Sequence, residues 1–419
     1  MFVLILLYVV LTVIRPQDYV PGLEGVPLLP AVLVLAFIAW AIGKKNFTAP
    51  QFFILPAFML VLMISQVTNG WSGGAIDEMA KFGPTVIAFY ILATACTSPR
   101  RLTLTMATLV ACSMVLAMHG VGQAKTGMGW TGIPIGEDGR IQYVGIFNDP
   151  NDLGLLFAAT LPLAAYLAMR SRFIGKLFWL SGLLLILYGV YLTNSRGAML
   201  AVLLVCGSYV WYRRGLVTAG VLGVVGLAGL KLLSSRMGEL DAEEESASGR
   251  VDAWYSGLHM FMSHPTFGVG AGNFTEYNDL TAHNSFVLVL AETGFAGFVL
   301  WLAFLGYTFW MLANILRHKF DDGGDASLAR RWRDERIAAL ALLLALVGLF
   351  TCAFFLSRSY MIVLYFFAAM ATGAYLGARE RFPELPELKF SRGGWRWVPI
   401  SMGSIAALFV LVAVLLRTT

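Results

Sequence analysis

Long apolar stretches alternate with short polar ones along the whole chain of 419 residues. The apolar runs are about 17 to 20 residues long, which is enough for each to cross a bilayer as an α-helix. The pattern predicts an all-α, polytopic integral membrane protein with about 12 or 13 transmembrane helices. The predicted spans are residues 2–14, 28–43, 51–67, 82–97, 102–119, 152–169, 177–195, 197–212, 215–233, 284–316, 337–356, 359–378 and 397–416.

Two polar segments between these spans are long enough to carry a site. The first covers residues 120–151 and the second covers residues 234–283. Within the second segment, apolar residues recur at helical spacing over residues 251–261, which predicts an amphipathic helix lying along the membrane surface. Ser248 is suited to cap the start of this helix, and Pro265 ends it because proline cannot continue a helix.

Composition excludes a soluble globular protein. Hydrophobic residues make up 58% of the chain and charged residues only 13%, whereas soluble domains carry about 25% charged residues. The four cysteines all lie in predicted spans, and their spacing gives neither a metal-binding motif nor a disulfide framework.

The charges indicate an orientation in the membrane. With the N-terminus in the cytoplasm and the spans alternating, 20 of the 30 Lys and Arg residues fall in cytoplasmic segments, while 17 of the 25 acidic residues fall outside. Cytoplasmic loops are enriched in Lys and Arg, so residues 120–150 and 234–283 are predicted to lie outside and residues 317–336 inside. The net charge of +5 reflects this orientation and forms no stripe suited to nucleic acid.

Five arginines depart from the inward bias of the basic residues. They are Arg15, Arg140, Arg196, Arg250 and Arg358. A charge at membrane depth costs about 2.5–3.5 kcal/mol on insertion scales, so it usually has a partner or a function. Guanidinium groups grip phosphate through two parallel hydrogen bonds and stay charged. Several of these arginines are therefore candidate pyrophosphate ligands, and snorkelling to lipid headgroups is the alternative.

His283 lies where a polar loop meets the apolar run from Phe286 to Phe304, which carries only one charge, Glu292. An imidazole exchanges protons near neutral pH, since its unperturbed pKa is about 6.5. His283 is therefore a candidate general base, and a polar residue of the first helical turn is the alternative interpretation. The nearby glycines at 268, 270 and 272 follow no strand, so a tight packing turn is favoured over a dinucleotide motif. An anion nest is the further alternative.

A second polar motif is Asn148-Asp149-Pro150-Asn151-Asp152. It lacks the spacing and the bidentate glutamate of an EF-hand, so we expect no metal there. Capping of the following helix by Asn151 or Asp152 is the simpler interpretation.

Taken together, these segments resemble the O-antigen ligase family, within the superfamily that includes O-antigen polymerases and bacterial O-oligosaccharyltransferases. The matching motifs are Gly145-Ile-Phe-Asn-Asp-Pro-Asn-Asp-Leu-Gly154, Asn194-Ser-Arg-Gly-Ala198, Gly249-Arg250 before an aromatic helix, His264-Pro-x-x-Gly-Val-Gly-x-Gly-Asn-Phe274, and His283-Asn followed by Glu-Thr-Gly294. They cover about residues 145–300 in order and spacing. The segment from Val13 to Tyr19 is also similar to the O-glycosylation ligase branch found beside exopolysaccharide loci.

The resemblance implies one transmembrane domain over residues 1–419, in the bacterial inner membrane, with residues 234–283 as a periplasmic loop that carries active-site residues. It implies an inverting glycosyltransferase that uses no metal or cofactor and moves a glycan from undecaprenyl pyrophosphate to a hydroxyl acceptor. In the ligases that acceptor is a sugar of the lipid A core. The catalytic histidine corresponds to His283 and the phosphate-binding arginines to Arg196 and Arg250, while Arg15 and Arg358 are further candidates for the pyrophosphate.

Three alternatives stay open at this point. An O-antigen polymerase takes a second lipid-linked glycan as acceptor, and a protein O-oligosaccharyltransferase takes a Ser or Thr. A lipid-linked glycan transporter would use the arginines to bind and release the headgroup without making a bond. A transporter should have a basic path across the bilayer, whereas these arginines gather on one side, which favours an enzyme. The expected partners are the donor, the acceptor and membrane lipids, with no nucleic acid.

Overall fold

The computed structural model describes residues 1–43, 45–136, 138–233, 241–321 and 323–418. Every predicted span coincides with a helix in it. These helices are α1 Phe2–Ile14, α2 Leu28–Ala41, α3 Gln51–Thr68, α4 Ser72–Ala95, α5 Pro99–Thr126, α6 Pro150–Arg170, α7 Phe173–Thr193, α8 Arg196–Arg214, α9 Leu216–Leu233, α12 Ser285–Arg317, α13 Ala326–Ala353, α14 Ile362–Arg381 and α16 Trp397–Thr418. The other α-helices are α10 Asp241–Ser263, α11 Phe274–Tyr277 and α15 Phe390–Gly393. The all-α prediction is confirmed.

Eight helices in the described part of the chain are long and apolar enough to span a membrane. Three more apolar helices are shorter, at 10–17 residues: α1, α2 and residues 216–229 of α9. The protein is therefore a polytopic membrane protein by the length and composition of its helices. The count of about 12 or 13 spans stays a prediction, because it needs the shorter helices and α4 and α8 to cross as well.

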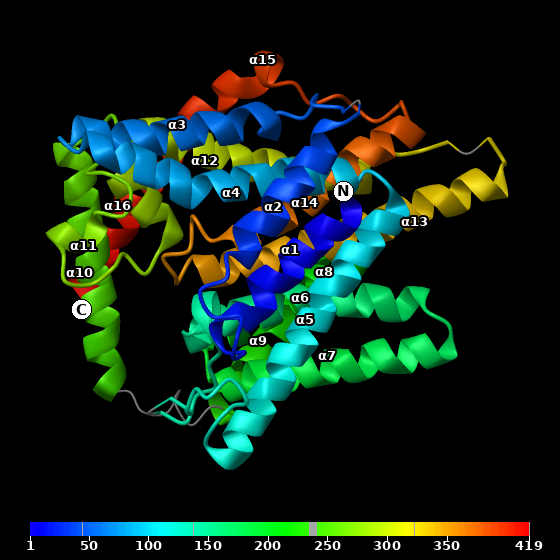
Figure 1. The fold of residues 1–419 in the computed structure, drawn as a ribbon, viewed down its shortest axis with the longest axis horizontal. Coiled ribbons are helices and arrows are strands. Elements are labelled where there is room, and N and C mark those ends of the chain that lie inside the picture. The colour runs from blue at the N-terminus through cyan, green and yellow to red at the C-terminus, as the bar shows by residue number, and fades with distance from the viewer. Residues whose placement is uncertain (44, 137, 234–240, 322, 419) are drawn as a thin grey trace.

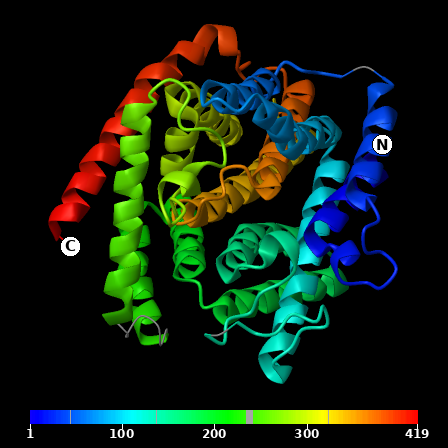
Figure 2. The same ribbon diagram turned by 60° about the vertical axis from the view of Figure 1, so that its left-hand side comes forward.

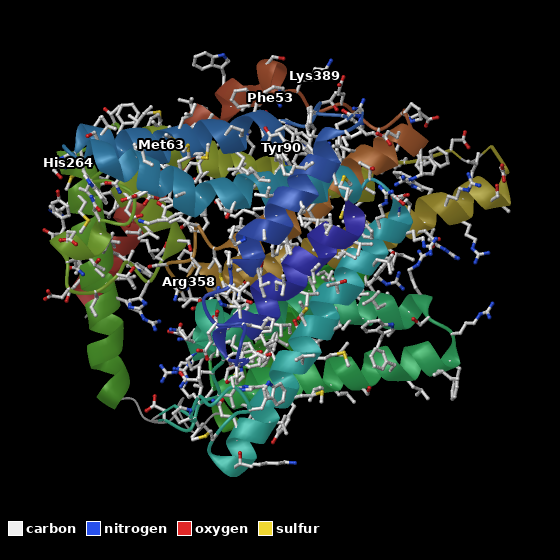
Figure 3. All side chains as sticks on the ribbon, viewed as in Figure 1. Phe53, Met63, Tyr90, His264, Arg358 and Lys389 are labelled. Atoms are coloured by element: carbon white, nitrogen blue, oxygen red, sulfur yellow. The ribbon has the colours of Figure 1, made fainter. Side chains whose placement is uncertain are left out.

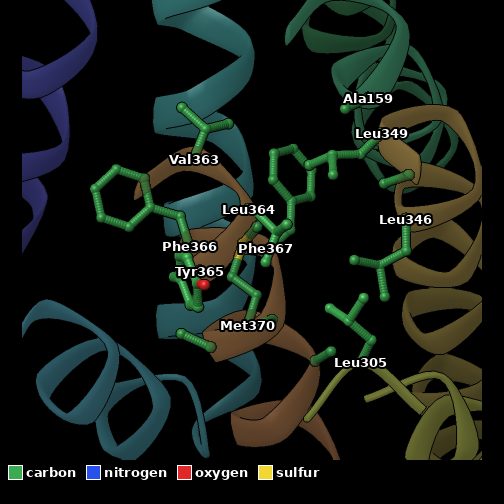
Figure 4. Close-up of a cluster of buried hydrophobic side chains, with 14 of the residues drawn as sticks. Ala159, Leu305, Leu346, Leu349, Val363, Leu364, Tyr365, Phe366, Phe367 and Met370 are labelled. Carbon is green, nitrogen blue, oxygen red and sulfur yellow. The ribbon is translucent and has the colours of Figure 1, made fainter. Parts of the chain in front are cut away.

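The centre of the bundle is formed by α6 and α14, the most buried of the spanning helices, whereas α7 and α16 are largely exposed. Figure 4 shows Phe367 and Met370 of α14 on the side of that helix that faces Leu346 of α13 and Leu305 of α12. On another face of α14, a Cβ atom at either of its two glycines would lie closer than 3.0 Å to a backbone oxygen of the segment that ends α4. Small residues thus let α14 approach α4 closely, as is common between membrane helices.

The bundle has two distinct ends (Figures 1 and 2). At one end α3, α7 and α13 finish and α6, α8, α12 and α14 begin. Helix α10 lies across this end and contacts α12 and α16, so we call it the α10 end. Figure 3 places both His264 and Arg358 on this side of the molecule. The opposite end, where α12 finishes and α13 begins, carries most of the arginines and lysines of the short loops; we call it the basic end.

Helix α10 is amphipathic, as predicted. It buries Val251, Trp254 and Leu258, while Tyr255 and His259 are exposed. It ends at Ser263, before the predicted proline. The expected start at Ser248 is wrong, because the helix already begins at Asp241. The preceding residues are mainly Ala and Glu, which favour helix, and acidic side chains stabilise a helix N-terminus.

Candidate active site

Helix α12 is broken at Gly294, where the backbone has φ 61° and ψ −160°. A break leaves backbone groups without helical partners, which is costly within a membrane. Here residues 265–270 supply the partners. Four hydrogen bonds of 2.8–3.2 Å join the backbone of this segment to that of residues 291–296. The loop after α10 is thereby fixed to the helix that follows His283.

Glycine is required at this junction. Gly268 and Gly294 both have positive φ, and a Cβ atom on either would lie closer than 3.0 Å to backbone atoms of the other segment. The two chains therefore approach at a distance that only glycine allows. This geometry confirms the interpretation of the glycine motif as a tight turn that packs the loop near His283.

The side-chain carboxylate of Glu292 accepts hydrogen bonds from N–H groups of the same glycine turn. It accepts hydrogen bonds from the backbone N–H groups of Gly272 and Phe274, and its other oxygen accepts one from the Tyr360 hydroxyl at 2.9 Å. The turn thus does bind an anion, but the anion belongs to the protein. Sequence analysis missed this role, and the signal available was the single charge in an apolar run.

The end of α3 holds the turn from the other side. Asn69 donates to the carbonyl of Gly268 at 2.9 Å, and the Ser65 hydroxyl accepts from the N–H of Ala271 at 3.1 Å. Gln66, which is buried, donates to the Ala271 carbonyl. These three side chains come from a segment about 200 residues away in sequence, and sequence analysis did not find them.

His283 stands at the entrance to α12 in a left-handed backbone conformation, with φ 46°. Such a conformation is costly for a residue with a side chain and is often found at functional sites. The next residue, Asn284, caps the helix: its side-chain oxygen accepts from the N–H groups of Phe286 and Val287 at 2.9 and 3.1 Å. The imidazole is therefore placed just outside the first helical turn.

The start of α12 is joined to the turn between α13 and α14. The Ser285 hydroxyl donates to the carbonyl of Leu356 at 2.7 Å and accepts from the N–H of Arg358 at 3.1 Å. Ser359 returns a bond to the carbonyl of Ser285 at 2.8 Å. These contacts fix the position of Arg358 relative to His283.

The guanidinium of Arg358 forms two hydrogen bonds to Asp152 of α6, at 2.5 and 2.7 Å. Burial lowers the pKa of Arg358, but the hydrogen bonds and the charge of Asp152 outweigh it, so the pKa is raised overall. Asp152 is 1% exposed, so it needs this partner. The edge of Arg358 best suited to phosphate is thus engaged by a carboxylate, and the role of Arg358 as a phosphate ligand stays a prediction.

The cap of α6 differs from the expected one. Its capping residue is Asp149, whose carboxylate accepts from the N–H of Asn151 at 2.6 Å. Capping by Asn151 or Asp152 is therefore wrong, because the helix begins at Pro150 and proline is favoured at the first helical position. Asn151 instead accepts from Arg140 at 2.8 Å, and Arg140 also donates to the Thr193 carbonyl at 2.8 Å.

Arg196 begins α8 immediately after its capping residue, Ser195. Its side chain is exposed, and the residue two positions earlier, Asn194, has φ 45° and ends α7 in a left-handed conformation. The positive end of the helix dipole and the guanidinium therefore lie together, which favours an anion at this point.

Electrostatic coupling shows which candidates come together. Burial lowers the pKa of His283, and the nearby Arg250 and Arg358 lower it further, while Asp149 opposes them. Burial likewise lowers the pKa of Arg250. The positive charge of Arg196 lowers it further, while the negative charge of Asp149 raises it. We call this group of five residues the site cluster: Asp149, Arg196, Arg250, His283 and Arg358. It combines a histidine that is neutral at pH 7 with three guanidinium groups, so it is suited to accept a proton and to bind an anion.

Arg15 has other contacts. Its Nε lies 2.5 Å from a carboxylate oxygen of Asp18, and its side chain packs on Gly145. Tyr143 supports the same region by donating to the Ile14 carbonyl at 2.9 Å. The structure thus brings Arg15 to the segment that precedes the site cluster, and its role in binding pyrophosphate stays a prediction.

No group of three or more His, Cys, Asp and Glu residues suited to a metal ion occurs in the described ranges of the chain.

A comparison with known families identifies residues 181–302 as matching the model described as O-Antigen ligase. The matched segment contains Arg196, Arg250 and His283, while Asp149 and Arg358 lie outside it. No curated protein matches the chain significantly. The family match confirms the resemblance carried by the sequence motifs.

Proposed function

Since residues 181–302 match the O-antigen ligase family, we propose that the protein is a glycosyltransferase that transfers a glycan from undecaprenyl pyrophosphate to a hydroxyl acceptor. The observation that carries the proposal is the site cluster: a neutral His283 beside Arg196, Arg250 and Arg358 at one end of the bundle. The preferred acceptor is a sugar of the lipid A core.

Arg196 and Arg250 bind the pyrophosphate. The pKa of Arg250 is lowered by burial and by the positive charge of Arg196, so a phosphate anion beside the two guanidinium groups stabilises the charged form of Arg250. Pyrophosphate is a good leaving group and needs its developing charge neutralised more than it needs a proton. Guanidinium groups fixed at the membrane surface provide this stabilisation in the transition state.

His283 acts as the general base. The acceptor hydroxyl oxygen attacks the anomeric carbon, and its proton passes to the imidazole. The bond between that carbon and the pyrophosphate oxygen breaks, and its electron pair leaves with the pyrophosphate. Attack from the face opposite the leaving group inverts the anomeric centre. Such base catalysis contributes about 10²–10⁴-fold to the rate.

The proposed site faces the periplasm from the bacterial inner membrane. The support is the distribution of basic residues, which gathers in the loops of the basic end. Single cysteines added within residues 120–150 or 234–283 should react with an impermeant thiol reagent in cells whose outer membrane is permeabilised. A cysteine within 317–336 should not react, and the parent chain is the background control. Labelling only at the third position would reverse the orientation.

The acceptor is tested with purified protein and undecaprenyl pyrophosphate-linked glycan. Lipid A–core, a second lipid-linked glycan and a Ser/Thr peptide are offered separately. Transfer to lipid A–core is expected. Transfer to the second or third acceptor would identify a polymerase or a protein O-oligosaccharyltransferase instead. Movement of the donor across vesicle membranes without transfer to any acceptor would identify a transporter.

The donor site is tested by single substitutions at Arg196 and Arg250. Replacement by Ala should weaken binding of the lipid-linked glycan, and replacement by Lys should restore it poorly, because Lys keeps the charge but lacks the planar fork. Full activity of both Lys variants would contradict bidentate phosphate binding.

A further inference from the structure

A cavity of about 550 Å³ opens at the basic end, far along the bundle from the site cluster. It lies between α5, α6, α13 and α14, which contribute Arg100, Arg170, Arg331 and Arg381 to its wall. The wall also includes the carboxylates of Asp334 and Glu335 and apolar side chains of α5 and α13. The charged side chains of the lining therefore carry a net positive charge.

Two of the four arginines are already paired. Arg170 lies 3.1 Å from Asp334, and Arg381 lies 2.7 Å from Glu335. Arg100 and Arg331 have no carboxylate partner within 4.0 Å among the described residues. They belong to α5 and α13 respectively, so the two unpaired guanidinium groups face one cavity from two helices.

The apolar part of the wall reaches the outer surface of the bundle. Leu104 lines the cavity and is 44% exposed on α5, a helix long and apolar enough to span the bilayer. Leu102 of α5 and Ala338 of α13 continue the apolar surface. A ligand that fits this wall has a negatively charged head for the arginines and hydrocarbon for the leucines.

We propose that this cavity binds an anionic phospholipid, whose phosphate contacts Arg100 and Arg331 and whose acyl chains lie along α5. Arginine recognises phosphate through planar, charge-assisted hydrogen bonds. Basic pockets between membrane helices are suited to such headgroups. The bound lipid bridges α5 and α13, whose cavity-lining carboxylates Asp334 and Glu335 are paired with Arg170 and Arg381. It occupies the end of the bundle away from the glycan site.

The test uses the full-length protein in detergent, titrated with phosphatidylglycerol and followed by native mass spectrometry. The double variant Arg100→Ala/Arg331→Ala should lose affinity about 30-fold, which corresponds to the loss of two basic contacts worth about 1 kcal/mol each. The control is Arg172→Ala/Lys176→Ala. It removes the same charge from exposed positions at the same end that do not line the cavity, and it should stay within about threefold of wild type.

Three further binding measurements test which part of the lipid the cavity recognises. Phosphatidylcholine, whose head has no net charge, should bind more weakly than phosphatidylglycerol. Inorganic phosphate alone should not displace the lipid, and displacement would show that the cavity takes a free anion. Ala338→Leu narrows the apolar part without changing charge and should also weaken lipid binding. Equal losses in the control and the arginine variant, or no loss in either, would overturn the proposal.

Discussion

At the basic end of the bundle the Arg170–Asp334 pair is exposed, whereas at the α10 end Arg358 pairs with the buried Asp152 close to His283. Arg170 and Asp334, a pair at the basic end, are each 40% exposed. Asp152, in the pair at the α10 end, is 1% exposed. Exposed pairs contribute about 0–1 kcal/mol, so the first arrangement mainly anchors the protein. The second fixes the position of Arg358 beside the catalytic candidate.

The backbone differs between the ends as well. The non-glycine residues with positive φ in the described part of the chain are Arg15, Asn194 and His283, and all three lie at the α10 end. Strained conformations persist only where surrounding contacts hold them, and they gather at functional sites. The α10 end thus combines the candidate site residues with turns that are held by tertiary contacts.

The largest expected effect is the difference in glycan transfer between arginine variants of the α10 end and arginine variants of the basic end. Arg196→Ala/Arg250→Ala should lower glycan transfer about 10³-fold or more, since removing one preorganised charge-stabilising donor typically costs 10²–10³. Arg170→Ala/Arg172→Ala removes two exposed arginines from the basic end and should keep transfer within about threefold. Steady-state transfer by purified protein measures both. Similar losses in the two variants would abolish the functional distinction between the ends.

The second prediction concerns the buried pair. Arg358→Met leaves the Asp152 carboxylate buried without a partner and should lower the free energy of unfolding by about 3 kcal/mol. Asp152→Leu/Arg358→Met should recover part of that loss, because no charge is left behind. A double-mutant cycle by chemical unfolding in detergent measures the coupling. A coupling below about 1 kcal/mol would make this pair no stronger than an exposed pair such as Arg170–Asp334 and would contradict the prediction.

The third prediction tests the contact that fixes the loop to α12. Gly268→Ala and Gly272→Ala both place a side chain at positive φ, but only Gly268 faces backbone within 3.0 Å, while Gly272 faces open space. The first should cost about 3 kcal/mol through strain and overpacking, and the second about 1 kcal/mol through strain alone. Thermal unfolding of the two variants measures the difference. Equal costs would mean that the close approach contributes nothing.

The smallest expected effect is a shift in pH dependence. A general base must be neutral, so transfer should be lost as the pH falls through the pKa of His283, which lies below its ordinary value of 6.5. Asp149 raises that pKa, so Asp149→Asn should move the acid limb to lower pH by about half a unit. Asn caps a helix as well as Asp does, so α6 should persist. A limb that moves to higher pH would contradict the assigned electrostatics.

Hydropathy predicted which segments are helical but not where they end. The apolar run of α4 begins at residue 82 and that of α13 at residue 337, yet the helices begin at Ser72 and Ala326. Polar residues extend a helix beyond its apolar part, and a pattern of hydrophobicity does not register them. Boundaries therefore follow local capping and tertiary contacts rather than the apolar pattern.

The candidate site was predictable only in part. His283, Arg196 and Arg250 stood out because each is a polar residue at an unexpected place in an apolar chain. The bond from Arg358 to Asp152 joins residues 206 positions apart, and packing of whole helices decides such a pairing. A sequence pattern predicts contacts only between residues of the same helix or loop. The side chains of other helices that hold the site were therefore found only in the structure.

The most direct test of the central claim is the turnover of His283→Gln with undecaprenyl pyrophosphate-linked glycan and the acceptor found for the wild type. Gln keeps much of the size and polarity of the imidazole but does not accept a proton near neutral pH. Transfer should fall about 10²–10⁴-fold, while donor binding and protein abundance stay close to wild type, because a base acts on the acceptor proton in the transition state. Near-normal turnover would show that His283 only orients the substrate and that the α10 end works without it as a base.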